Sequence, residues 1–134
     1  MNAPTSSTEI QSLQAKQAIL VNALRPFLEE DALLWQPEDT IPYECDGLAA
    51  YRKMPLAVAL PENEEQVVNI LKACKALGVP VVPRGSGTGL SGGAMPIEQG
   101  LVLSLAKFKK ILQVDPFTRT AVVQPGVRNL AISE

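Results

Sequence analysis

Five of the nine glycines of this chain lie within nine residues, in the run GSGTGLSGG at residues 85–93. The run follows the apolar segment 79–82, Pro83 and the cation Arg84. A backbone with so few side chains adopts positive φ without strain and can bring its N–H groups close to a ligand. Concave arrays of backbone N–H groups bind phosphate. The run therefore predicts a loop that binds the phosphates of a nucleotide or dinucleotide cofactor.

The first part of the chain has the pattern of one helix followed by an irregular connection. Apolar residues keep helical spacing from residue 9 onward, with Ser7 or Thr8 as the expected N-cap. Pro26 should end this helix because proline lacks the N–H donor and clashes with the preceding turn. Residues 36–55 contain Pro37, Pro42, Gly47 and Pro55, which favours mostly irregular structure.

The remainder alternates short apolar runs with one clear helix. Asn63 and Gln66 resemble a capping box, and Gly78 stands where a helix C-terminus needs positive φ. Another helix begins near residue 127 and reaches the last residue without a cap. The predicted order is β-α-β-loop-β-β-β-α, an α+β fold, with strands expected at residues 56–60, 79–82, 101–105, 111–114 and 120–124.

We accordingly divide the chain into an N-terminal tail, helix and connecting arm over residues 1–50 and a domain over residues 51–134. Because the last helix begins and does not end, the domain is expected to be incomplete at its C-terminal end. A length of 134 residues has room for one core on the usual scale of roughly 100–200 residues per domain.

The composition excludes several kinds of site. The chain has no histidine, which removes histidine bases and histidine metal ligands from these residues. The cysteines Cys45 and Cys74 do not form a disulfide framework, and Cys74 lies on the apolar face of the second predicted helix. Lys107, Lys109 and Lys110 are expected to form a solvated face.

Charge and hydropathy indicate the surroundings in which the chain works. Its net charge of -2 does not suggest a nucleic-acid surface. The N-terminus lacks the basic and apolar regions of a signal peptide, and no apolar run approaches the ~20 residues of a membrane span. We therefore expect no transmembrane segment and a cytoplasmic protein.

Three phosphate-binding loop types compete for the glycine run. A Walker loop needs Gly-Lys-Ser/Thr at its end, and this run has no lysine. Gly87, Gly89 and Gly92 fit GxGxxG, with Asp115 further along, but a Rossmann unit needs a helix opening at the third glycine. Residues 93–100 leave no room for such a helix before the next strand. The remaining type is a long loop between two strands that holds a pyrophosphate by its backbone amides.

The glycine run and its neighbouring segments resemble those of a known family. The segment PRGSGTGLSGGA at residues 83–94 resembles the flavin loop of FAD-linked oxidases of the vanillyl-alcohol-oxidase superfamily, whose FAD-binding domain is called PCMH-type. Residues 55–61, 101–105 and 123–127 match neighbouring segments of that family in order. Residues 43–48 and the pair Tyr51-Arg52 are most similar to the group of the glycolate oxidase flavoprotein subunit and D-lactate dehydrogenase.

The resemblance implies that FAD lies between two α+β subdomains, of which this chain supplies the first and at most the start of the second. Thr88 occupies the place of the flavin-linking histidine of covalent members, so the resemblance implies non-covalent FAD. Taken from the residues alone, Arg84 either binds phosphate or pairs with a surface carboxylate. The cofactor-binding residues implied by position are Pro83, Arg84, Gly85, Ser86, Gly87, Thr88, Gly89, Leu90, Ser91, Gly92, Pro125 and Gly126.

The resemblance further implies the front part of a dehydrogenase or oxidase that converts a 2-hydroxy acid to a 2-oxo acid, with hydride transfer to flavin N5. It implies that the base, the groups that bind the substrate carboxylate and any metal ligands lie beyond Glu134, so no catalytic and no metal-binding residue is expected within these residues. Partner subunits of a glycolate-oxidase-like complex, and through them a position at the periphery of the inner membrane, are implied in the same way. The alternative is a non-catalytic half-domain that binds a nucleotide or a partner without turnover.

Overall fold

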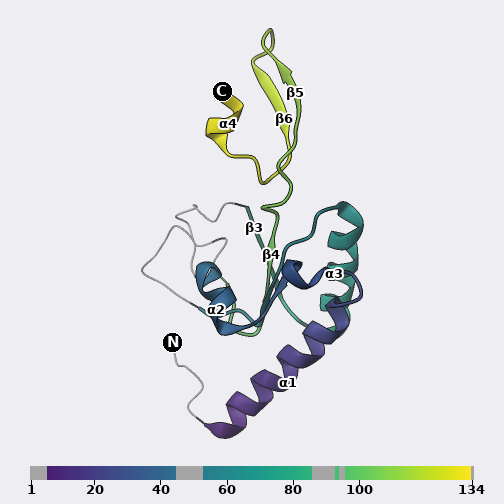
Figure 1. Ribbon diagram of the computed structural model, residues 1–134, viewed down its shortest axis with the longest axis vertical. Helices are drawn as coiled ribbons and strands as arrows, with labels where there is room; N and C mark the ends of the chain where they lie inside the picture. Colours follow the sequence, from purple (N-terminus) through teal and green to yellow (C-terminus); the bar gives the residue numbers. More distant parts are fainter. Residues whose placement is uncertain (1–5, 45–52, 86–92, 94–95, 134) are drawn as a thin grey trace.

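The computed structural model describes residues 6–44, 53–85, 93 and 96–133 (Figure 1). Its main body is a four-stranded sheet with the strand order β1-β2-β4-β3. The strands are β1 (Leu33–Leu34), β2 (Ala57–Ala59), β3 (Val81–Arg84) and β4 (Leu101–Ser104). β4 runs parallel to both β2 and β3, whereas β1 is antiparallel to β2. Residues 85–100 thus connect two neighbouring parallel strands, a connection that must return from one end of the sheet to the other.

The two long helices begin and end at capping signals. In α1 (Ser7–Leu24), the Ser6 hydroxyl accepts a hydrogen bond from the Glu9 N–H at 3.1 Å, and the Glu9 carboxylate accepts one from the Ser6 N–H. The expectation of Ser7 or Thr8 as N-cap was therefore wrong by one or two residues, because the partner of a capping box is the glutamate three positions on. The helix ends before Pro26, as predicted.

The helix between β2 and β3 has its predicted N-cap and C-cap residues but lacks the return bond of a capping box. α3 spans Glu64–Leu77, and the Asn63 side chain accepts a hydrogen bond from the Gln66 N–H at 2.9 Å. The Gln66 side chain in turn accepts from the N–H of Glu62 rather than from that of Asn63. Gly78 ends the helix with φ 67°, the left-handed conformation in which glycine carries no steric penalty.

Residues 30–43 are more regular than their prolines suggested. They form the 3-10 turn η1 (Glu30–Ala32), strand β1, the short helix α2 (Pro37–Thr40) and the 3-10 turn η2 (Ile41–Tyr43). The prediction of an irregular connection was wrong for 37–43. Proline at the first position of a helix needs no N–H partner and has the helical φ already, so here it starts the helix instead of breaking one.

The core lies between the sheet and the helices α1 and α3. Every residue of β2 and β4 is buried, as expected of central parallel strands with apolar sequence. Leu20 and Leu24 of α1 and Ile70 and Cys74 of α3 belong to the same hydrophobic cluster. Leu33 of β1 belongs to it as well. The N-terminal helix and first strand therefore share one core with the strands that follow.

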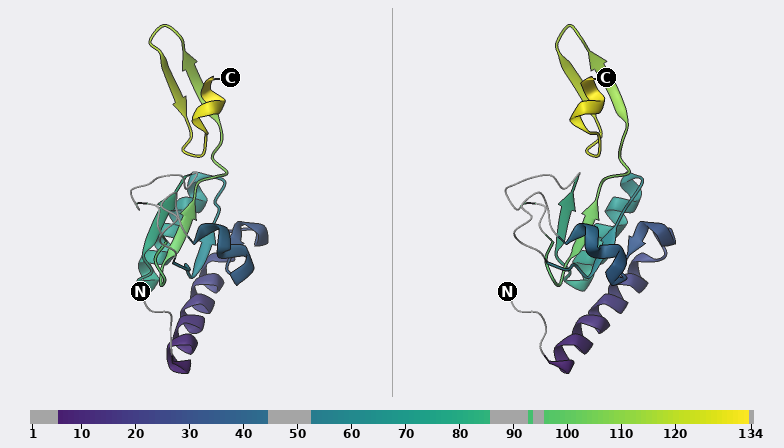
Figure 2. Two further views of the ribbon diagram at one scale, coloured as in Figure 1. Left: turned by 90° about the vertical axis from the view of Figure 1, so that its left-hand side faces the viewer. Right: turned by 60° about the vertical axis from the view of Figure 1, so that its left-hand side comes forward.

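A two-stranded antiparallel hairpin and a short helix project from the end of the sheet (Figures 1 and 2). They are β5 (Ile111–Asp115), β6 (Thr120–Val123) and α4 (Asn129–Ser133). Asp115 shapes the hairpin turn, since its carboxylate accepts hydrogen bonds from the N–H groups of Phe117 and Thr118. Hydrogen bonds from the Thr118 hydroxyl and from the backbone N–H groups of Thr118 and Phe117 lower the pKa of the Asp115 carboxyl. Most side chains of the hairpin are exposed.

Candidate functional site

The carboxyl ends of β3 and β4 meet at one edge of the sheet. Arg84 and Ser104 are register partners there, and the N–H of Leu105 donates to the carbonyl oxygen of Arg84 at 2.8 Å. The glycine run begins immediately after Arg84. Ligands of open sheets with parallel strands bind outside the carboxyl ends of the strands, so this edge is where a cofactor is expected.

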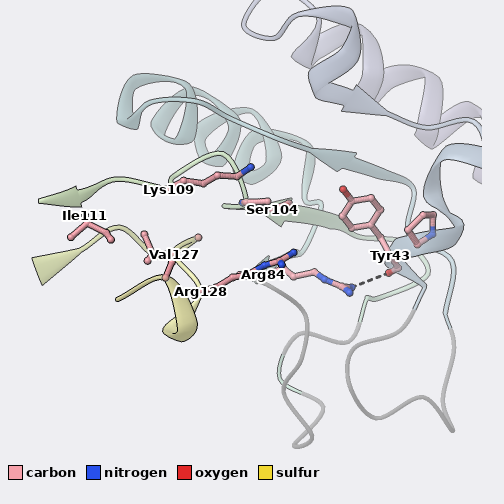
Figure 3. A pocket seen from close by; sticks show the side chains of 12 residues that line it. Tyr43, Arg84, Ser104, Lys109, Ile111, Val127 and Arg128 are labelled. Carbon is pink, nitrogen blue, oxygen red and sulfur yellow. Dashed lines mark hydrogen bonds between the residues drawn. The ribbon is translucent and has the colours of Figure 1, made fainter. Parts of the chain in front are cut away.

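A cavity of about 520 Å³ opens at this edge, between the sheet and the base of the hairpin (Figure 3). Its polar lining comes from five separate segments: Tyr43 from η2, Arg84 from β3, Ser104 from β4, Lys109 from the segment before the hairpin and Arg128 from the segment after it. Gly85 and Gly126 line it with backbone. Its volume lies within the usual range of roughly 300–1,000 Å³ for ligand pockets.

Arg84 is a buried cation, and among the described residues its side chain contacts only uncharged groups. Its side chain is 9% exposed, and one guanidinium nitrogen donates to the Tyr43 carbonyl oxygen at 3.4 Å. The guanidinium carbon also lies 5.4 Å from the centre of the Tyr43 ring, a cation–π distance. The pairing with a surface carboxylate, one of the two alternatives for Arg84, does not occur among the described residues, whose one ion pair joins Lys107 to Glu62.

Gly85 and Pro125 lie next to each other beside the cavity. A Cβ on Gly85 would lie 3.4 Å from the carbonyl oxygen of Pro125, so the two predicted segments touch. At Gly126, a Cβ would lie 2.5 Å from the carbonyl oxygen of Leu105. Gly126 therefore packs closely against protein backbone and also lines the cavity.

The predicted cofactor-binding residues are brought together only in part. Arg84, Gly85 and Gly126 line the cavity, whereas Pro83 and Pro125 are exposed and are not among its lining residues. Residues 86–92, with the predictions Ser86, Gly87, Thr88, Gly89, Leu90, Ser91 and Gly92, lie outside the described residues.

Sequence reasoning missed four polar lining residues: Tyr43, Ser104, Lys109 and Arg128. Lys109 is exposed, as expected for a solvated face, and it lines the cavity as well. Only the register of β4 against β3 could have drawn attention to Ser104, which is the strand-end partner of Arg84.

The charge of the cavity fits an anionic ligand. Arg84, Lys109 and Arg128 are its charged lining residues, and no aspartate or glutamate is among the described residues that line it. Across the described ranges, no group of three histidine, cysteine or acidic side chains could hold a metal ion. No helix in these ranges is both long and apolar enough to cross a membrane.

Comparison with known proteins identifies the family. The family described as "FAD binding domain" matches residues 55–134. Glycolate oxidase subunit GlcD of Escherichia coli (strain K12) is 58% identical over 112 residues, which are 84% of this chain and 22% of that protein. D-lactate dehydrogenase of Archaeoglobus fulgidus is 49% identical over 70 residues, 52% of this chain and 16% of that protein. The chain therefore spans about a fifth of the length of the curated relatives that it matches.

A solved structure supports the same assignment. p-Cresol methylhydroxylase with substrate bound has a TM-score of 0.73 and 28% sequence identity, covering 85% of this chain and 23% of that protein. The expected α+β fold of a PCMH-type domain is thereby confirmed. With the family match over more than half of its length, the chain belongs to the family of FAD-binding domains, and its cofactor is FAD.

Proposed function

We propose that this chain is the FAD-binding portion of a flavin-dependent 2-hydroxy-acid dehydrogenase or oxidase of the glycolate or D-lactate type. The observation that carries the proposal is the cavity at the carboxyl edge of the sheet, where Arg84, Gly85 and Gly126 converge beside the start of the glycine run. Relatives named glycolate oxidase subunit GlcD, D-lactate dehydrogenase and D-2-hydroxyglutarate dehydrogenase support the substrate class.

The proposed work of this chain is to hold and orient the cofactor. When bound, FAD supplies the hydride acceptor for oxidation of the hydroxy acid. Backbone N–H groups of residues 85–89 would surround its pyrophosphate, with Ser91 and Gly92 nearer the flavin. Hydrogen bonds to a charged group contribute roughly 1.5–3 kcal/mol each. Attachment is non-covalent in this proposal, because the chain has Thr88 and no histidine.

The division of the chain is part of the same proposal. Residues 51–134 form the FAD-binding domain, and residues 1–50 form an arm that supports it. The support has a physical basis, because Leu20 and Leu24 of α1 pack in the same core as Val58 and Val102 of the central strands. A cytoplasmic location and partner subunits that bring the protein to the inner membrane are proposals that rest on family resemblance.

Gly87→Asp tests the loop. The variant is made in a longer polypeptide that contains this chain and matches the full length of its relatives. FAD content is measured by absorbance after purification. A side chain and a negative charge at a pyrophosphate both clash, so FAD should be lost. Gln11→Glu is the control, because it adds the same charge at an exposed position of α1 that does not line the cavity. Normal FAD content in Gly87→Asp would contradict the loop assignment.

The activity is tested in the same polypeptide without substitutions. Glycolate, D-lactate or D-2-hydroxyglutarate should bleach the flavin absorbance under anaerobic conditions, with one equivalent of 2-oxo acid formed per flavin. Tightly bound FAD that none of these acids reduces would favour the non-catalytic alternative.

A further inference from the structure

A second cavity, of about 350 Å³, opens where the end of α1 meets β1, and we call it the arm pocket. Its volume lies within the usual range of roughly 300–1,000 Å³ for ligand pockets. It shares no described lining residue with the cavity at the cofactor edge. Its lining combines apolar and charged side chains, namely Leu28, Leu33, Trp35, Arg25, Glu29 and Glu30.

The apolar wall of the arm pocket is fixed by the core. Leu28 and Leu33 belong to the hydrophobic cluster, and Trp35 packs against it. The Gln17 side chain donates to the carbonyl oxygen of Trp35 at 3.1 Å and to that of Leu56 at 2.9 Å, which ties this part of the chain to α1. A pocket with walls held in this way needs little reorganisation to receive a side chain.

Charge is divided between the arm pocket and the hairpin. Residues 25–39, which surround the pocket in sequence, contain one basic and five acidic residues, a net charge of -4. Residues 107–128, which contain the hairpin, have five basic residues and one acidic residue, a net charge of +4. Surfaces of opposite charge attract and orient one another. The hairpin of one molecule is therefore complementary in charge to the arm pocket of another.

The turn of the hairpin presents an apolar side chain and a cation close together in sequence. Phe117 is 99% exposed. Arg119 is exposed as well, and no carboxylate in the described part of the chain pairs with it. Its backbone has φ 56°, a left-handed conformation that is uncommon outside glycine and is frequent at functional positions. Phenylalanine and arginine are both enriched at protein interfaces.

The turn of one molecule does not fill its own arm pocket. The hairpin projects away from the main body, which contains α1 (Figures 1 and 2). The pocket lies at the end of α1. A contact between the two must therefore join two molecules.

We propose that two copies of this chain associate by insertion of Phe117 of one copy into the arm pocket of the other. The phenyl ring would pack against Leu33 and Trp35, since aromatic rings favour offset or edge-to-face contact. Arg119 would pair with Glu29 and Glu30 at the side of the pocket. The contact is smaller than the roughly 1,200–2,000 Å² of a stable interface, so association should be weak and reversible. It requires no cofactor and is independent of the proposed function.

Sedimentation of the 134-residue chain at increasing concentration tests the proposal. Trp35 is the one tryptophan of the sequence, so its fluorescence reports on the pocket directly. We expect wild type to associate reversibly, with emission moving to shorter wavelength as the complex forms. Phe117→Ala and Arg119→Glu should each weaken association at least tenfold. The control Lys72→Glu makes the same charge change at an exposed residue of α3 and should change association less than threefold.

A mixing experiment identifies the two contacting surfaces. Glu29→Arg/Glu30→Arg should also weaken association at least tenfold. Mixed with Phe117→Ala, it should associate again, because the intact turn of one variant meets the intact pocket of the other.

Three results would overturn the proposal: no association of wild type up to about 1 mM, unchanged association of Phe117→Ala, or no association in the mixture. The second result would place the contact elsewhere on the molecule, for example at the strand edges of the hairpin. Circular dichroism spectra of the single variants should match wild type, since the substituted side chains are exposed.

Discussion

Gly126 donates its backbone N–H to the carbonyl oxygen of Phe108 at 2.8 Å, and this bond ties the base of the hairpin to the segment that leaves β4. The approach leaves no room for a side chain. A Cβ on Gly126 would lie 2.5 Å from the carbonyl oxygen of Leu105 and 2.7 Å from that of Phe108. Both neighbours are backbone atoms, so relief would require movement of the chain itself.

Gly126→Ala should therefore destabilise the chain. We expect the free energy of unfolding to fall by about 2 kcal/mol, within the range for overpacked sites. Urea denaturation followed by circular dichroism measures it. Gly93→Ala is the matched control, since its Cβ would meet nothing within 4 Å. Equal urea midpoints for the two variants would show that the close approach at Gly126 does not limit the stability of the chain.

The core predicts that α1 is an integral part of the domain. Leu24 is fully buried against the cluster that contains the central strands, whereas Ile19 on the same helix is 55% exposed. Leu24→Ala should lower the free energy of unfolding by about 2–5 kcal/mol, and Ile19→Ala by less than about 1 kcal/mol. Thermal unfolding followed at 222 nm gives the difference. Similar melting temperatures for both variants would mean that α1 does not support the core.

Burial of Cys74 predicts a pH dependence. Burial raises the pKa of its thiol to about 11 from an ordinary value of 9.0. Above pH 9 the unfolded chain loses this proton while the folded chain keeps it, so stability is complete below pH 9 and falls between pH 9 and 11. The loss at pH 11 is about 2 kcal/mol.

Urea unfolding at pH 8 and pH 11 checks the Cys74 prediction. Other groups titrate in the same range, so the comparison is between wild type and Cys74→Ala. The wild type should lose more stability than the variant over this interval. In a Cys45→Ser background, the remaining thiol should also resist a disulfide reagent at pH 8 until the chain is unfolded. A rapid reaction in the folded state would contradict the burial.

The elements that could be predicted are those whose signals are local. Asn63 and Gly78 mark the ends of α3 because capping depends on hydrogen bonds within a few residues. β1 could not be found in this way. Leu33 and Leu34 form a strand only because they pair with Ala59 and Val58, which lie far along the chain. This strand depends on tertiary pairing, because two residues are too few to show a periodic pattern in the sequence.

The candidate site likewise combines residues that a local pattern could predict with residues that only the fold brings together. The glycine run marks its place in the sequence, and the family match supports the cofactor. The side chains of Lys109 and Arg128 reach the cavity only through the path of the chain after β4 and after β6. Lys109 stands between Lys110 and Phe108, and nothing in that local pattern distinguishes it from its exposed neighbour.

The strand order determines which strand edges are open to pairing with another molecule. The outer strands of the main sheet are β1, which has two residues, and β3, which contains Pro83. A short strand and a proline without an N–H both discourage a foreign strand from adding to a sheet. The hairpin has no such protection, because Leu112 and Val114 are more than half exposed beside unpaired strand edges. Self-association of this chain in concentrated solution should therefore begin at β5 and β6.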